Sequence, residues 1–195
     1  MPASFDIQAP AWLERFLAAR PAVPSTDENR MQLAVALARE NSLRETGGPF
    51  GAAVFDMHTG RLVAAGVNLV VSSGLSLAHA EMVALGLAQR AQGHYDLGTG
   101  GAAMELVSST EPCAMCLGAV PWSGVRRLLC GARTEDAERI GMDEGAKPPD
   151  WIDALERRGI AVRRDVLREE AAAVLADYAR RGGILYNGRS AASEE

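Results

Sequence analysis

Residues 79–81 read His-Ala-Glu, and residues 112–116 read Pro-Cys-Ala-Met-Cys. One imidazole and two thiols are ligands that zinc prefers, and a set of three protein ligands leaves a fourth position open, as in catalytic zinc sites. Two cysteines separated by two residues can both face one ion when they lie at the first turn of a helix, where the helix dipole also favours thiolates. The two segments therefore predict one zinc ion per chain, held by His79, Cys113 and Cys116.

The carboxylate of Glu81 lies two residues after the predicted ligand His79. Along the first turn of a helix, this spacing lets the carboxylate face the open position of the metal without binding it. A zinc ion lowers the pKa of bound water from about 15.7 to about 7, so that a neighbouring base can move its protons near neutral pH. We therefore predict that Glu81 is a proton shuttle.

A cysteine pair at this spacing has two other common uses, as half of a structural zinc ribbon or as a redox motif. A redox pair is expected near the first βαβ unit, whereas this pair lies past the middle of the chain. The combination of H-x-E with P-C-x-x-C is instead the signature of zinc-dependent nucleobase deaminases. On these residues the chain resembles the cytidine deaminase-like superfamily.

Length and composition agree with a compact enzyme. The chain has 195 residues, of which 48% are hydrophobic and 23% are charged, enough to fill the core of one domain. Three cysteines, two of them assigned to zinc, give no disulfide framework, and we expect Cys130 to be a buried, inert thiol. No secretory signal and no apolar run of about 18 residues is present, so we expect a cytoplasmic protein without a membrane partner.

Hydrophobic periodicity predicts alternating helices and strands. We expect helices over residues 12–20, 27–45, 78–92 and 166–181, another helix beginning at Cys113, and strands over residues 52–56, 62–68, 105–108, 127–131 and 160–162. This order predicts an α/β fold of three layers, α/β/α, around a mixed sheet of about five strands. The two metal-binding helices would begin beside adjacent strand ends, in the crevice where such sheets bind ligands.

The domain organisation follows from the same pattern. Residues 1–28, with four prolines around one short amphipathic piece, are expected to form an N-terminal extension. Residues 29–187 are expected to form the zinc-dependent deaminase domain, and residues 188–195 a C-terminal tail. The run Pro148-Pro149-Asp150-Trp151 is a candidate for a lid.

The charge balance argues against nucleic acid as a partner. Binding to a phosphate backbone requires a basic face, whereas this chain has a net charge of −5. The arginine doublets at 157–158 and 163–164 are interleaved with acidic residues, which is typical of a solvated, ion-paired face. A small free base or nucleoside therefore fits better than an RNA.

Further segments resemble bacterial guanine deaminases over residues 30–187. They are Gly47 to Gly51 (Gly-Gly-Pro-Phe-Gly), Asn68, the two metal segments with Glu111, the pair Gly118-Ala119, and Trp122. The resemblance implies hydrolysis of guanine to xanthine and ammonia, with Glu81 carrying a proton from water to the ring nitrogen beside C2. It further implies that Asn68 hydrogen-bonds the purine and that Phe50 and Trp122 pack around it.

The resemblance also implies a second acid, which helps to protonate the departing amino group. It follows a Gly-aromatic-Asp sequence in the family, and the matching stretch here is Gly141-Met142-Asp143-Glu144, in which methionine replaces the aromatic residue. We assign this role to Glu144, with Asp143 as the alternative acid and a substrate contact. Tyr186 matches a C-terminal tyrosine that covers the bound base.

Several alternatives stay open. Asn68 could satisfy backbone groups in a turn, Phe50 and Trp122 could be core residues, and Glu144 could be a solvated loop acid. The substrate could instead be another amino-heteroaromatic ring, such as ammeline or cytosine. A transfer RNA adenosine deaminase and a non-catalytic zinc-stabilised binding module are further possibilities. Relatives are commonly dimers, so the resemblance implies a homodimer.

Overall fold

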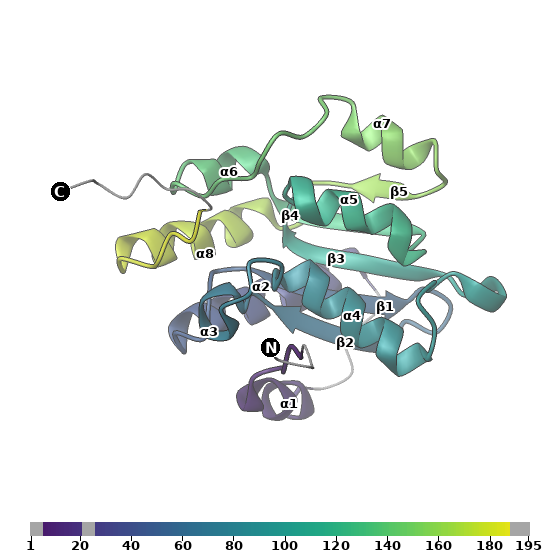
Figure 1. The fold of residues 1–195 in the computed structure, drawn as a ribbon, viewed down its shortest axis with the longest axis horizontal. Coiled ribbons are helices and arrows are strands. Elements are labelled where there is room, and N and C mark those ends of the chain that lie inside the picture. The colour runs from purple at the N-terminus through teal and green to yellow at the C-terminus, as the bar shows by residue number, and fades with distance from the viewer. Residues whose placement is uncertain (1–5, 21–25, 188–195) are drawn as a thin grey trace, which may run out of the picture.

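A five-stranded sheet forms the centre of the computed structural model, which describes residues 6–20 and 26–187 (Figure 1). The strands are β1 (Gly51–Asp56), β2 (Leu62–Val67), β3 (Met104–Thr110), β4 (Arg127–Ala132) and β5 (Ala161–Arg163), and their order in the sheet is β2-β1-β3-β4-β5. The predicted strands are confirmed to within two residues at each end.

The strand directions bring several carboxyl ends to one edge of the sheet. Strand β1 pairs antiparallel with both β2 and β3, whereas β3, β4 and β5 are mutually parallel. Strands β2, β3, β4 and β5 therefore run in the same direction, opposite to β1. The segments that follow β2, β3 and β4 consequently begin at the same edge, where ligands bind in sheets of this kind.

Helices cover both faces of the sheet. The element order adds α1 (Ala11–Ala18), α2 (Asp27–Leu43), α3 (Val70–Ser73), α4 (Ala80–Gln92), η1 (Thr99–Gly101), α5 (Ala114–Ser123), α6 (Thr134–Glu138), α7 (Trp151–Glu156) and α8 (Arg168–Arg180). Helices α2 and α8 share one hydrophobic cluster with the sheet, and α4, α5 and α7 share a second cluster on the other face (Figure 1). The predicted three-layer α/β/α fold is confirmed.

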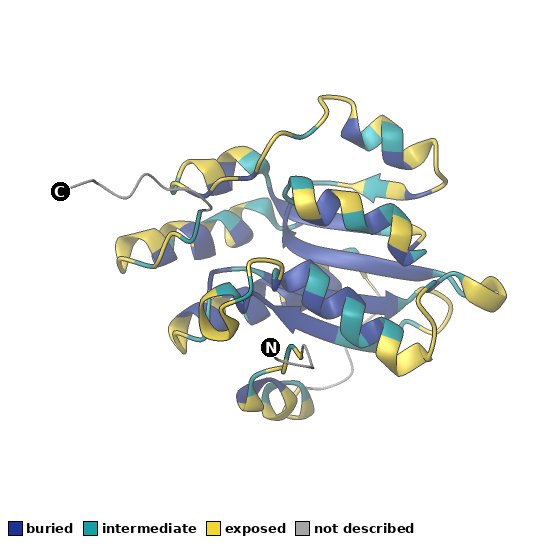
Figure 2. Ribbon diagram, viewed as in Figure 1, coloured by how far each residue is buried: buried dark blue, intermediate teal, exposed yellow. Residues whose placement is uncertain are grey.

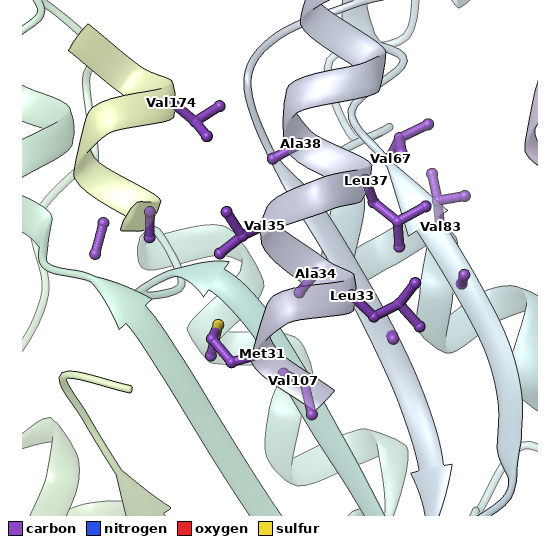
Figure 3. Packing of buried hydrophobic residues seen from close by; sticks show 14 of the residues in the cluster. Met31, Leu33, Ala34, Val35, Leu37, Ala38, Val67, Val83, Val107 and Val174 are labelled. Carbon is purple, nitrogen blue, oxygen red and sulfur yellow. The ribbon is translucent and has the colours of Figure 1, made fainter. Parts of the chain in front are cut away.

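The buried face of α2 fills the first cluster. Figure 3 shows its side chains against valines from β2, β3, α4 and α8, and the labelled residues are Met31, Leu33, Ala34, Val35, Leu37, Ala38, Val67, Val83, Val107 and Val174. Close approach depends on glycine in the strands. A Cβ atom added to Gly51 would lie 2.4 Å from the Ala34 oxygen of α2, and one added to Gly66 would lie 2.4 Å from the Ala80 oxygen of α4. Both helices therefore pack directly onto the sheet backbone.

Some expectations need additions. The N-terminal extension contains α1, whose Trp12 and Leu13 are buried against the domain, with Trp12 Nε1 donating to Thr46 Oγ1 at 3.0 Å. Residues 1–5, 21–25 and the expected tail 188–195 lie outside the described residues. Helices α3, α6 and α7 were not expected, and Trp151, a lid candidate, instead packs in the second hydrophobic cluster. In the described part of the chain, every helix is too short or too polar to cross a bilayer.

A buried ion cluster joins α2 to the end of the sheet opposite the site described below. Glu105 of β3 is fully buried and pairs with Arg30 of α2, which is 5% exposed, and with Arg127 of β4 at 3.0 Å. Arg127 also pairs with Asp27, the first residue of α2, and these bonds hold the pKa of the Asp27 carboxyl below its usual value. The cluster fixes the start of α2 against two strands.

Replacing Arg30 by methionine should destabilise the protein. The Arg30→Met variant leaves the buried carboxylate of Glu105 with a single cationic partner, and breaking such a buried pair costs about 3–5 kcal/mol. Because Arg127 still compensates part of the charge, we expect the free energy of unfolding to fall by about 3 kcal/mol, measured by urea denaturation followed by circular dichroism.

Two further variants test the cause. In Arg30→Met/Glu105→Leu no charge is left unpaired in the core, so at least half of the lost stability should return. The control Arg180→Met removes a side chain that is 73% exposed and pairs with Asp177 within α8, and should change stability by less than about 1 kcal/mol. A loss in Arg30→Met no larger than in this control would contradict a stabilising role for the cluster.

Candidate metal centre and base pocket

Two helices begin at the predicted metal ligands. His79 is the N-cap residue of α4 and Cys113 is the N-cap residue of α5, and both have extended backbone angles. Their helices start at the sheet edge where β2 and β3 end, so Cys113 Sγ lies 3.5 Å from His79 Nδ1. The 34-residue gap between them is filled by α4 and β3, as the sequence predicted.

The three predicted ligand atoms form one cluster. His79, Cys113 and Cys116 each offer a donor atom, and these atoms all lie within 4.8 Å of one another. Hydrogen bonding from Cys116 and from His79 lowers the pKa of the Cys113 thiol to about 4, although burial acts in the opposite direction. Burial lowers the pKa of His79, but its bond to Cys113 outweighs this and raises the pKa overall.

This donor set fits zinc. Two sulfurs and one imidazole are ligands of catalytic zinc sites, and the stabilised thiolate at Cys113 is the form that binds a metal. Among the described residues, it is the one group of three or more such side chains within reach of a single ion. Cys130 is buried without such neighbours, as expected, and burial raises its pKa.

Glu81 is buried beside these ligands. Its side chain is on the first turn of α4 and is 7% exposed. Ser108 Oγ of β3 donates to Glu81 Oε1 at 3.1 Å, and Cys116 Sγ donates to Glu81 Oε2 at 3.4 Å. Burial raises the pKa of Glu81, and the nearby charge of Cys113 raises it further. The carboxyl group can therefore exchange protons with a ligand next to the metal.

A fixed amide lies across the pocket. Asn68 follows β2 and is 1% exposed, and its Oδ1 accepts from Gly48 N at 3.3 Å and from Val70 N at 3.2 Å. These two donors determine the orientation of the amide, because Oδ1 must face them. Asn68 Nδ2 has no hydrogen-bond partner within the described residues. A buried donor of this kind costs free energy unless a ligand pairs with it.

A cavity of about 150 Å³ opens in front of these groups. Its lining residues are Phe50, Asn68, Val70, Ser76, His79, Glu81, Glu111, Cys113, Met142, Asp143, Glu144, Tyr186 and Asn187. Pockets for drug-sized ligands span about 300–1,000 Å³. A smaller cavity with apolar walls and a few polar groups suits a single small ring system.

The segment 141–144 brings two acids to the cavity lining, the buried Glu144 and the exposed Asp143. Glu144 is 6% exposed, and burial, together with the charges of Cys113 and Glu81, raises its pKa to about 8. The exposed Asp143 instead accepts from Gly145 N at 2.9 Å through Oδ1, while its backbone N–H donates to Asn187 Oδ1 at 2.9 Å. A buried carboxyl group with a raised pKa keeps its proton over a wider pH range, which is what a proton donor requires.

Other predicted contacts divide into two groups. Tyr186 reaches the cavity from the C-terminal segment, with its ring edge-on to that of His79 and 6.3 Å between centroids, and the half-buried Phe50 lines the same cavity. Trp122 does not reach the cavity, and its side chain is 83% exposed on α5. The expectation that Trp122 forms a wall of the pocket is therefore not supported within one chain. The sequence analysis assigned no place in the pocket to Glu111 or Asn187, although both line it and each is within two residues of a predicted site residue.

Comparisons with known proteins agree with this geometry. The family model described as the cytidine and deoxycytidylate deaminase zinc-binding region matches residues 24–132. A structure of guanine deaminase from Nitrosomonas europaea shares 46% sequence identity, covers 92% of this chain and 98% of its own, and superimposes with a TM-score of 0.87. Another solved structure, a complex with 2,6-diaminopurine, shares 47% identity over 94% of this chain and 97% of its own, with a TM-score of 0.86.

A relative found by sequence is also a guanine deaminase. The guanine deaminase of Bacillus subtilis (strain 168) is 37% identical over 117 residues, which are 60% of this chain and 71% of the relative. The family model matches more than half of the described fold, including both metal-binding segments. The chain therefore belongs to the zinc-binding cytidine and deoxycytidylate deaminase family, and within it resembles guanine deaminases.

Proposed function

We propose that this protein hydrolyses guanine to xanthine and ammonia. The observation that carries the proposal is the buried Asn68 Nδ2, a donor without a partner among the described residues. It lies in a small cavity that is also lined by two of the three zinc ligands, His79 and Cys113, and by three buried carboxyl groups. This donor suits a ring acceptor such as O6 or N7 of guanine. The proposal is supported by the similarity to guanine deaminases from two organisms.

Each residue of the site has its own role in the proposed reaction. His79, Cys113 and Cys116 would hold zinc, a Lewis acid that would lower the pKa of bound water toward neutral pH. Glu81 takes one proton from the attacking water and delivers it to the ring nitrogen next to C2, while the water oxygen forms a bond to C2. Glu144 then helps to transfer the proton of the new C2 hydroxyl to the C2 amino group. The C2–N bond breaks as the C2 carbonyl forms, and ammonia leaves xanthine behind. Phe50 and Tyr186 hold the ring between them, and Asp143 supports the loop that carries Glu144.

A homodimer is part of the proposal. Met115, Gly118 and Trp122 are exposed and follow one another at intervals of three and four residues, so they form a stripe along one side of α5. Figure 2 shows that α5 carries exposed segments. Tryptophan and methionine are enriched in protein interfaces, and a patch on one helix can pair with its own copy about a two-fold axis. We therefore place a second copy of the chain on this stripe. Residues 29–187 would form the catalytic unit and residues 1–28 an accessory extension.

The cytoplasm is the location that suits the cysteines. All three are free thiols, and thiols that bind a metal persist where the compartment is reducing.

Guanine should be the substrate that releases ammonia fastest in a panel with cytosine, adenosine and ammeline, measured with the zinc-loaded protein.

In Asn68→Asp the side chain keeps the oxygen that accepts from Gly48 and Val70 but loses the Nδ2 donor, and we expect kcat/KM for guanine to fall by about 10- to 100-fold.

The control Asn29→Asp makes the same change on α2, away from the cavity, and should leave kcat/KM unchanged. If another compound of the panel released ammonia faster than guanine, that compound would be the better candidate for the substrate. Release from none of them, with one zinc per chain present, would support a non-catalytic module instead.

Glu81→Gln should separate metal binding from turnover. The amide keeps the shape of the side chain but cannot accept a proton, so we expect kcat to fall by about 10²- to 10⁴-fold. Zinc should stay at one equivalent per chain by elemental analysis, because Glu81 is not a ligand. A zinc-loaded variant with full activity would refute the shuttle role.

Trp122→Lys should convert the dimer to a monomer. A charge in the centre of an apolar interface costs free energy on association, so sedimentation equilibrium should give a mass near the 20.7 kDa of one chain. The control Tyr95→Lys changes a similarly exposed aromatic residue, 78% exposed, in the loop that follows α4, and should stay dimeric. A wild-type protein that is monomeric at micromolar concentration would exclude the interface.

A further inference from the structure

Lys147 is the one lysine among the 20 lysine and arginine residues of the chain, and it is partly buried. Its side chain is 9% exposed. Nζ donates to the Pro112 oxygen at 3.0 Å and to Thr134 Oγ1, and lies 3.8 Å from Glu111 Oε2. An ammonium group has three N–H donors, and three oxygen atoms surround this one.

The contacts of Lys147 join the two halves of the active site. Pro112 immediately precedes the ligand Cys113, and Glu144 lies three residues before Lys147. On the other side of Cys113, the backbone N–H of Ala114 donates to the backbone carbonyl oxygen of Glu144 at 2.8 Å. The segment 144–147 is thus attached to the start of α5 at two points, one on each side of the metal ligand.

The approach between these two segments is close. Gly145 has a φ of +69°, and a Cβ atom added to it would lie 3.0 Å from Ala114 Cβ. The loop therefore rests directly on the first turn of α5. A change in the position of this loop would move Glu144 with respect to Cys113.

Glu111 anchors the far side of the Lys147 ammonium. Its carboxylate is 3% exposed, accepts from Arg164 Nε through Oε1, and accepts from Thr134 N and Oγ1 through Oε2 at 3.1 and 2.8 Å. The ring of Trp151 lies 5.6 Å from Lys147 Nζ. With so many fixed neighbours, the ammonium has a single position. A planar guanidinium in its place could not direct three donors from one nitrogen atom.

We propose that Lys147 is a positioning residue that sets the place of Glu144 opposite the Cys113 ligand. The proposal rests on the deaminase function proposed above. Lys147 does not line the cavity among the described residues, so its effect on the reaction passes through the loop that carries Glu144. Loss of the ammonium would leave the Pro112 oxygen without this donor and release the loop from one of its two attachments.

A double-mutant cycle in the zinc-loaded protein tests this role. In Lys147→Met we expect kcat for guanine to fall about 10- to 100-fold, the usual effect of losing an outer partner of a metal site. KM should change less than about threefold, and zinc should stay at one per chain. The decisive comparison uses Glu144→Gln. If Lys147 acts through Glu144, the double variant should be no slower than Glu144→Gln alone.

The controls separate positioning from general damage. Arg127→Met removes a partly buried cation at the opposite end of β4 and should lower stability without changing kcat. If Lys147→Met does not fold, Thr134→Val removes one of the acceptors of Lys147. Thr134→Val should lower kcat by at least about threefold in the wild-type protein. The same substitution should not lower kcat further in Glu144→Gln.

Two results would overturn the proposal. One is a kcat in Lys147→Met/Glu144→Gln that is lower than in Glu144→Gln by the full factor lost in Lys147→Met alone. The other is an unchanged kcat in Lys147→Met. A wild-type protein that releases no ammonia from guanine would instead refute the proposed function, so the two failures can be told apart.

Discussion

The contact between His79 and Cys113 determines the arrangement of the cavity. Each residue is the last extended position before a helix, and the two helices start side by side because β2 and β3 end at the same edge of the sheet. Three other groups of the site are placed with respect to this pair. Glu81 follows on the first turn of α4, Cys116 follows on the first turn of α5, and the backbone of Glu144 is bonded to the residue after Cys113. The site therefore depends on rigid elements rather than on one flexible loop.

The metal ligands and Glu81 could be predicted from the sequence because their geometry is local. In each segment a spacing of two or three residues at a helix start is enough to place the side chains. The long strands and helices could be predicted for the same reason, since their hydrophobic periodicity extends over many residues. Helices α6 and α7, of five and six residues, have too few turns for such a pattern, and tertiary contacts determine them.

The orientation of Trp122 could have been predicted more closely. It lies six residues after Cys116 on the same helix, which at 3.6 residues per turn places it about 120° around the helix from that ligand. Family resemblance placed it near the substrate without regard to this rotation. The choice between Asp143 and Glu144, in contrast, could not be made from spacing alone. It depends on the turn at Gly145 and on the burial of one carboxyl group, which only the folded chain shows.

The distribution of charge around the cavity constrains the ligand. Glu81, Glu144 and the Cys113 thiolate face a small buried space, while the cations Lys147 and Arg164 lie behind them and pair with Glu111. These cations offset part of the buried negative charge without offering a donor to the cavity. A phosphate group would meet four carboxyl groups there, and no lysine or arginine among the described lining residues, so a nucleotide is a poor fit. A neutral base with a ring acceptor for Asn68 and an exocyclic amino group beside Glu144 carries no such penalty, and the electrostatics of the pocket therefore favour a free base over a phosphorylated one.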